Sequence, residues 1–290
     1  MSRTFLLVLL ALFAGLAISV SAQNQLDGRP LDPDIDPDID MFMGSWQNSI
    51  PYNTHGALVE RAILSPLRGD DHLRPTSKGA VLRNINRISR ATLDPKASTS
   101  PVTLNGEQEI LYITSGKGTI TAGGETAGLS DGILVLMPEG LEFTISNTED
   151  ELLEIYLVNE KVGSGFTPNK KMTIVNEKTM PYRDVGIPKT HWSHNGKGIF
   201  GKRNGLATLS AITLITFNAM TIGHPHSHGE DYEEIWTVIE GKGIAFLGKE
   251  IRWQPPGTAY KIPQTDFTPH SNINVTEKPV KYLYISWQPK

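Results

Sequence analysis

The most distinctive chemical feature of the sequence is the pair His226 and His228, which lies in a Gly-His-Pro-His-Ser-His run. These residues are two apart, so on a β-strand both imidazoles point to the same face. Two acidic residues, Glu233 and Glu234, follow closely, and a further histidine, His270, comes later in the chain. Imidazoles and a carboxylate on neighbouring strands can together hold a transition metal. The pattern therefore predicts a metal site.

Two positions in this predicted site have alternatives. Glu233 could be the carboxylate ligand in place of Glu234 if the strand contained a local bulge. His224 has the same strand parity as His226 and His228 and could replace one of them after a register shift. Glu234 is also the candidate for handling protons in catalysis. Mixed nitrogen and oxygen ligands suit one divalent transition metal, which could be Fe, Mn, Ni, Cu or Zn.

Further side chains could line the site. Trp236 has the parity of the metal-site carboxylate and would face the same cavity, although it could equally be core packing. Tyr260 is the second predicted pocket residue. It could contact an anionic substrate together with Lys261 and Arg252, although packed or solvated side chains are the commoner role for such residues. The isolated pair in His191–His194 could overhang the site, but such pairs are more often structural.

The elements that must position these residues are predicted to be strands. The 290 residues are 39% hydrophobic and 20% charged, which excludes collagen, coiled coil and wholesale disorder. From Ser89 onward, short runs rich in Val, Ile, Thr, Leu and Tyr are interrupted about every 8–12 residues by Gly, Pro, Asn or Asp, as in a sandwich or barrel. Residues 54–79 are rich in Pro and Gly and are expected to be irregular. A formal net charge of −4 gives no indication of nucleic-acid binding.

The chain also contains an internal repeat. Glu109–Gly118 and Glu234–Gly243 share a Glu and two Gly at an offset of 125 residues. The repeat predicts two copies of one β unit, an N-terminal domain over residues 41–162 and a C-terminal domain over residues 172–290.

The first copy lacks the histidines of the second. The positions that correspond to the three histidines hold Pro101, Thr103 and Phe143, and of the ligand set only Glu109 remains. A lone carboxylate is not a metal site. The first domain is therefore expected to be structural.

The order and spacing of these residues resemble the motifs of the cupin superfamily. The first motif places His-x-His, then a Glu and a Gly; the second places Gly-x5-Pro, then His-x3-Asn. Here the matching residues are His226, His228, Glu234, Gly241, Gly257, Pro263, His270 and Asn274. The interval from His228 to Glu234 is one residue longer than usual, and that from Pro263 to His270 is two longer. The resemblance covers about Thr92 to Trp287.

This resemblance implies an all-β fold of two tandem cupin barrels, each a double-stranded β-helix or jelly roll, with metal ligands only in the C-terminal one. It also implies a mononuclear metalloenzyme of dioxygenase or decarboxylase type that acts on a small oxygen-rich substrate. One alternative is a non-redox lyase or isomerase of sugar-derived acids. Another is a non-catalytic ligand-binding protein of the cell envelope. Two-barrel chains often assemble through sheet edges, which is compatible with a homo-oligomer.

The N-terminal residues predict export. Arg3 precedes an apolar run over residues 5–20, and small residues lead up to Ala22, which is the pattern of a secretory signal peptide over residues 1–22. The apolar run is too short to span a membrane stably. The chain has no cysteine, so thiolates cannot contribute to the metal site. We expect a secreted or periplasmic protein with a flexible acidic arm at residues 23–40.

Overall fold

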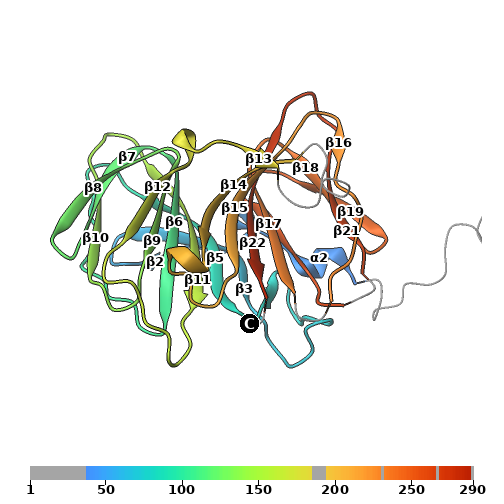
Figure 1. Cartoon of the computed structure of the whole chain (residues 1–290), viewed down its shortest axis with the longest axis horizontal. Helices are drawn as coiled ribbons and strands as arrows, with labels where there is room; N and C mark the ends of the chain where they lie inside the picture. Colours follow the sequence, from blue (N-terminus) through green and yellow to red (C-terminus); the bar gives the residue numbers. More distant parts are fainter. Residues whose placement is uncertain (1–36, 185–193, 230–231, 266–267, 289–290) are drawn as a thin grey trace, which may run out of the picture. The chain divides into compact units, whose positions relative to one another are not determined.

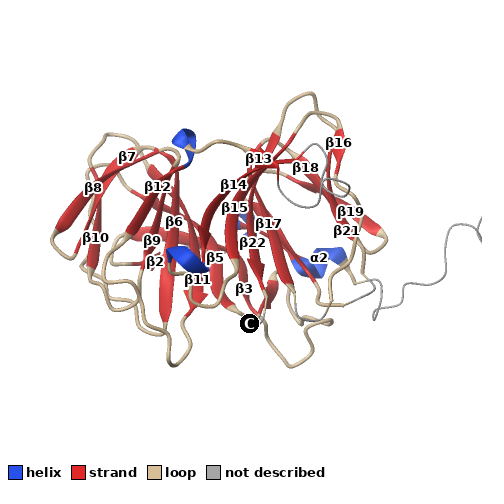
Figure 2. Ribbon diagram, in the orientation of Figure 1, coloured by secondary structure: helices blue, strands red, loops and turns tan. Residues whose placement is uncertain are grey.

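The computed structural model describes residues 37–184, 194–229, 232–265 and 268–288. The predicted signal peptide lies outside these residues, and so does most of the predicted acidic arm. Strands dominate the described chain, which confirms the predicted all-β class (Figures 1 and 2). Among the described residues, no helix has the length and apolar character needed to cross a membrane.

The elements up to β11 form the first half of this chain. They are α2 (Ile39–Phe42), β1 (Met43–Ser45), a 3-10 helix (Trp46–Asn48), β2 (Tyr52–Thr54), β3 (Leu58–Pro66), β4 (Ala80–Leu82), β5 (Ile85–Leu93), β6 (Glu107–Ser115), β7 (Lys117–Ala122), β8 (Glu125–Ser130), β9 (Ile133–Met137), β10 (Phe143–Asn147) and β11 (Leu153–Lys161).

The remaining elements form the second half. They are β12 (Thr173–Asn176), a 3-10 helix (Glu177–Thr179), β13 (Arg183–Asp184), β14 (His194–Gly201), a 3-10 helix (Lys202–Asn204), β15 (Ala211–Phe217), β16 (Thr221–Ile222), β17 (Glu233–Glu240), β18 (Gly243–Leu247), β19 (Glu250–Gln254), β20 (Thr258–Ile262), β21 (His270–Asn274) and β22 (Val280–Trp287).

Each half consists of a large sheet and a small sheet. The first half has an eight-stranded sheet in the order β12-β9-β6-β11-β5-β3-β2, with β4 paired to β3, and a three-stranded sheet β10-β7-β8. The second has a seven-stranded sheet β1-β20-β17-β22-β15-β14-β13 and a four-stranded sheet β16-β21-β18-β19. These sheets are open, so the predicted barrels are pairs of sheets and are not closed by hydrogen bonds.

The two halves exchange short strands. β1 precedes the first repeat in the chain, but it pairs with β20 of the seven-stranded sheet. β12 follows the first repeat, but it pairs with β9 of the eight-stranded sheet. The sheets therefore do not follow the boundaries of the sequence repeat at their edges.

The alternation of side chains along β6 divides the apolar core in two. Leu111 and Ile113 face a core shared with the small sheet of the first half. Ile110 and Tyr112 point to the opposite face and belong to a second core, which also contains Ile235 of β17. A strand with both faces buried must be apolar at nearly every position, as β6 is from Ile110 to Ile113.

The sequence repeat is also a structural repeat. The side chain of Asn147 donates hydrogen bonds to the carbonyls of residues 93, 94 and 151, and Asn274 donates to those of residues 217, 218 and 278. Gly116 and Gly241 occupy equivalent turns of the two repeats, with φ of +81° and +82°. A Cβ at either glycine would lie within 3 Å of the carbonyl oxygen of the residue just before the adjoining strand, so the repeat requires glycine at both turns.

Two segments are more ordered than expected. Residues 54–79 were predicted to be irregular, but they contain the nine-residue strand β3, whose run Leu-Val-Glu-Arg-Ala-Ile-Leu partly alternates between buried and half-buried positions. The last residues of the predicted arm are packed: Ile39 is fully buried, and Asp40 forms an ion pair with Arg252 at 3.0 Å. These contacts attach the start of the described chain to β19.

Candidate metal centre

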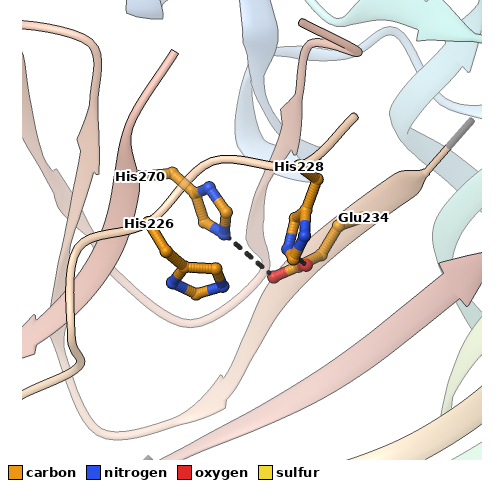
Figure 3. A group of neighbouring side chains, drawn as sticks. All are labelled: His226, His228, Glu234 and His270. Atoms are coloured by element: carbon orange, nitrogen blue, oxygen red, sulfur yellow. Dashed lines mark ion pairs between the residues drawn. The ribbon is translucent and has the colours of Figure 1, made fainter. Parts of the chain in front are cut away.

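Four side chains of the second half converge on one point (Figure 3). Each offers one potential ligand atom, and these atoms all lie within 4.8 Å of one another. The residues are His226, His228, Glu234 and His270. Within the described residues this is the one group of three or more histidine or acidic side chains close enough to hold a metal ion. The four residues are those that the sequence motif predicts.

Backbone pairing holds two of the histidines side by side. The amide of His226 donates to the carbonyl of His270 at 3.2 Å, and the amide of His270 donates to the carbonyl of His226 at 2.9 Å. The two rings are consequently 4.4 Å apart at their centroids. His270 is the first residue of β21, so strand geometry fixes the direction of its imidazole.

The carboxylate of Glu234 is held by three neighbours. Nε2 of His228 lies 2.6 Å from one of its oxygens, and Nε2 of His270 lies 3.3 Å from the other. The indole Nε1 of Trp236 donates a hydrogen bond to the same oxygen as His270. Glu234 is 2% exposed, so these contacts replace the solvation that the carboxylate loses on burial.

The charges of the site favour metal binding. Burial alone would raise the pKa of Glu234, but the adjacent His270 and His228 outweigh it and hold the pKa below its usual range. Burial and the neighbouring His270 lower the pKa of His226 to about 4. At neutral pH the carboxylate is therefore ionised and the His226 imidazole is neutral, and these are the forms in which the two groups bind metals.

Neither alternative ligand joins the group. Glu233 points to the other face of β17, where its carboxylate accepts a hydrogen bond from Nδ2 of Asn84 at 2.7 Å. The pairing of Glu233 and Glu234 with β22 is regular, so the bulge that would turn Glu233 inward is absent. His224 is exposed, and its carbonyl oxygen lies 2.8 Å from Nδ1 of His226.

The predicted pocket residues take different positions. Trp236 lines a cavity of about 10 Å³ beside His226 and His270, which is room for a single water molecule. Tyr260 is fully buried, and its hydroxyl donates to the carbonyl of Ser271 at 3.1 Å. Its ring packs in the apolar core.

The basic residues considered for an anionic substrate have other contacts. Nζ of Lys261 lies 3.6 Å from Glu233. Arg252 forms ion pairs with Asp40 and Glu250. Neither cation belongs to the group of four.

Three residues near the site were missed or underrated from the sequence. His194 lines the small cavity, whereas His191 of the same pair lies outside the described residues. Tyr232 stacks on His228 with ring centroids 4.2 Å apart, and its hydroxyl lies 2.5 Å from that of Tyr284. Strand parity could have indicated Tyr232, which is two residues before Glu234. Nothing in the sequence pairs it with Tyr284.

The phenols of Tyr232 and Tyr284 stay protonated at neutral pH. Burial and the charge of Glu234 raise the pKa of both, and that of Tyr284 lies well above its usual value. Because one hydroxyl donates to the other, the pair keeps one O–H proton that can be donated beside the metal centre.

We expect the Trp236→Phe substitution to weaken metal binding about tenfold, because it removes the hydrogen bond that orients Glu234 and such partners typically contribute 10–100-fold. The measurement is a metal titration of the folded protein. Trp253→Phe is the matched control, since Trp253 is 51% exposed and does not contact the group. Equal affinities in the two variants would show that the indole does not orient the carboxylate.

The equivalent place in the first half holds ion pairs. The carboxylate of Glu109 lies 3.2 Å from Nε2 of His55 and 3.5 Å from a guanidinium nitrogen of Arg87. Phe143, which takes the place of the third histidine, packs against the His55 ring at 5.7 Å. Arg87 also pairs with Glu60 at 2.7 Å. The imidazole of His55 and the guanidinium of Arg87 thus compensate the charge of the buried Glu109 carboxylate, beside which the motif histidines are replaced.

This ion pair predicts a pH-dependent contribution to stability. Burial alone lowers the pKa of His55, but the hydrogen bond and charge of Glu109 outweigh it, so the pKa is raised. A histidine whose pKa is raised on folding stabilises the folded state fully at pH values below its unfolded-state pKa of about 6.5. This stabilisation is lost as the pH rises through the folded-state pKa. We expect His55→Gln to cost more unfolding free energy at about pH 5.5 than at about pH 9. Urea denaturation at both pH values measures this, and a pH-independent cost would contradict it.

Comparison with known proteins agrees with this architecture. A family model described as a cupin domain matches residues 89–159, in the first half. No curated protein matches the chain. Similar solved structures include a putative glyoxylate induced protein from Pseudomonas aeruginosa, at 14% identity over 90% of this chain and 93% of that chain with a TM-score of 0.69. A deletion mutant of Bacillus subtilis oxalate decarboxylase is similar at 15% identity over 89% and 80%, with a TM-score of 0.60.

A third similar structure carries the same domain name. It is a cupin 2 conserved barrel domain protein from Leptotrichia buccalis, at 15% identity over 82% of this chain and 92% of that chain, with a TM-score of 0.52. Identities this low show the fold and not the activity. Together with the two structural repeats and the cupin domain matched over residues 89–159, they show that the chain has a cupin fold.

Proposed function

We propose that the protein is a metal-dependent enzyme that uses the group in the second half to act on a small oxygen-rich acid. The observation that carries this proposal is the convergence of His226, His228, Glu234 and His270, whose ligand atoms lie within 4.8 Å of one another. Three imidazoles and a carboxylate fit one divalent Fe, Mn, Ni, Cu or Zn ion. The burial of Glu234 and His270 favours a bound cation over two solvated side chains, because burying a carboxylate without a positive partner is costly.

The side chains around the metal centre have different roles in the proposed reaction. A divalent metal held by the four side chains would supply Lewis-acid polarisation of a substrate oxygen and, if redox-active, electron transfer. Trp236 fixes the orientation of the Glu234 carboxylate through its indole hydrogen bond. Glu234 is ionised and is the candidate for accepting a proton. One hydroxyl of the Tyr232–Tyr284 pair donates to the other, and the remaining O–H proton beside His228 can be donated to a substrate oxygen.

The class of substrate is supported by analogy. One similar structure is an oxalate decarboxylase and another is a putative glyoxylate induced protein. Both names refer to small acids rich in oxygen, which can offer two oxygens to one metal ion. The analogy is at the level of fold, so it selects which compounds to test first.

We further propose that the protein acts outside the cytoplasm, on the basis of the signal-peptide pattern in residues 1–22. An exported enzyme cannot rely on a reducing compartment to protect thiols, which agrees with a site built without cysteine. Detection of the mature N-terminus near Gln23 in a periplasmic or extracellular fraction would support export, and an intact N-terminus in the cytoplasm would contradict it.

Turnover measurements test the proposed activity. Protein loaded separately with each candidate metal is incubated with oxalate, glyoxylate and related small acids, in air and under argon. We expect consumption of at least one acid by one metal-loaded form. Dependence on oxygen indicates an oxidative or decarboxylase-type reaction, and equal turnover under argon indicates a lyase or isomerase. Thermal stabilisation by an acid without any consumption would contradict catalysis and favour a binding protein.

A further inference from the structure

The two halves hold each other through a pair of reciprocal contacts. In one, the carboxylate of Glu233 in the second half accepts hydrogen bonds from the first half, at 2.7 Å from Nδ2 of Asn84 and at 3.3 Å from the amide of Arg83. In the other, the side-chain amide of Gln108 in the first half donates to the carbonyl of Gly205 in the second half at 2.9 Å. We call these the Glu233 contact and the Gln108 contact.

The two contacts occupy equivalent places in the repeat. Gln108 directly precedes Glu109, and Glu233 directly precedes Glu234, at the same offset of 125 residues as the rest of the repeat. Gln108 also donates to Glu160 at 2.6 Å. The Glu160 carboxylate in turn accepts from the amide of Thr208 at 2.5 Å, and Thr208 is the counterpart of Arg83 at that offset. Arg83 lies just before β5, and Thr208 lies just before the equivalent strand β15. In each half, the backbone amide of this residue therefore donates to a carboxylate of the other half.

The consequences of the two contacts differ, because only one lies beside the group of four. Glu233 is the first residue of β17, and the next residue is Glu234. Successive strand residues point to opposite faces. Fixing the Glu233 side chain on the face toward Asn84 therefore fixes the Glu234 side chain on the opposite face, toward the three histidines. The corresponding residue beside Gln108 is Glu109, which faces His55 and Arg87.

We propose that Asn84 of the first half is a positioning residue for the metal centre of the second half, acting through Glu233. This gives the first half, which lacks the ligand histidines, a role in the site: it holds the end of the strand that carries the metal carboxylate. The inference rests on the proposed metal binding. Asn84 is partly buried and lies in a turn, so its replacement by Ala removes one hydrogen bond without emptying the core.

The test is Co²⁺ binding to the full chain, followed by the visible absorbance of the ion, for wild type, Asn84→Ala and Gln108→Ala. Gln108→Ala is the control, since it breaks the other contact between the halves. We expect Asn84→Ala to weaken Co²⁺ binding about tenfold, within the range for groups that orient ligands, and to change the spectrum. We expect Gln108→Ala to leave both unchanged while lowering the melting temperature.

The outcomes separate this inference from the proposed function. If wild type binds Co²⁺ but the two variants bind it with the same affinity and spectrum, the contact is merely structural and the inference is overturned. If wild type binds no Co²⁺, the metal function fails, and the inference fails with it. A second variant, Asn84→Asp, places a carboxylate against Glu233 and is expected to weaken binding at least as much as Asn84→Ala. Its control is Gln108→Glu, which places a carboxylate against Glu160.

Discussion

The His228→Ala variant is expected to lose its metal under conditions in which the wild-type chain retains one equivalent. Nε2 of His228 lies 2.6 Å from the Glu234 carboxylate and is one of the four converging donors. Removing a direct ligand should weaken binding by more than about 100-fold, since loss of a supporting group alone typically costs 10–100-fold. Elemental analysis of the variant after dialysis measures the effect.

The matched control for this experiment is His224→Ala. His224 lies in the same segment, is exposed and is outside the group of four. It should keep its metal, since the contact of His224 with His226 is made by a backbone carbonyl oxygen that alanine retains. A His228→Ala protein that still holds one equivalent would refute the ligand assignment, and metal loss in His224→Ala would indicate a shifted register.

The second large effect concerns stability. Glu233→Ala should lower the free energy of unfolding by about 3–5 kcal/mol, the usual cost of removing one partner from a buried ion pair. Lys261, whose Nζ lies 3.6 Å from Glu233, is fully buried. Burial already lowers its pKa, and without Glu233 it would be a buried charge lacking its carboxylate. Urea denaturation of the variant measures the cost.

The pH dependence and a double variant check the cause of this loss. A lysine whose pKa is lowered in the folded state is protonated more readily in the unfolded state, so the stability of Glu233→Ala should increase as the pH rises. Adding Lys261→Met should recover much of the loss, because an apolar side chain of similar length then fills the site. A loss that is independent of pH and unrelieved by Lys261→Met would mean that the ion pair is not responsible.

The sequence was sufficient to predict the all-β class and the four converging residues. The repeat relates Glu234 to Glu109. The expectation that strand parity aligns His226 and His228 was wrong in detail, because His226 forms only an isolated bridge with His270 and His228 lies outside the strands. The same parity argument required a choice between Glu233 and Glu234. The structure shows that the partner of Glu233 is Asn84, which lies 149 positions away in the chain. No local pattern could have revealed that contact.

Other features depended equally on long-range contacts. The exchange of β1 and β12 between the sheets leaves no trace in local periodicity. His55 has no counterpart in the motif, yet it faces Glu109 in the first half. Tyr284 lies on β22, opposite Trp236 of β17, and only this pairing brings its hydroxyl to Tyr232. Periodicity predicts the strands, whereas the order of strands in the sheets determines which side chains meet.

The most direct test of the central claim is the metal content of the purified chain, measured by elemental analysis with electron paramagnetic resonance on the same sample. We predict about one Fe, Mn, Ni, Cu or Zn ion per chain, in accordance with one group of nitrogen and oxygen donors. A paramagnetic ion would direct the search to oxygen-dependent reactions, and zinc would direct it to non-redox ones. A chain that binds none of these metals, even after reconstitution, would contradict the proposal that this group is a metal centre.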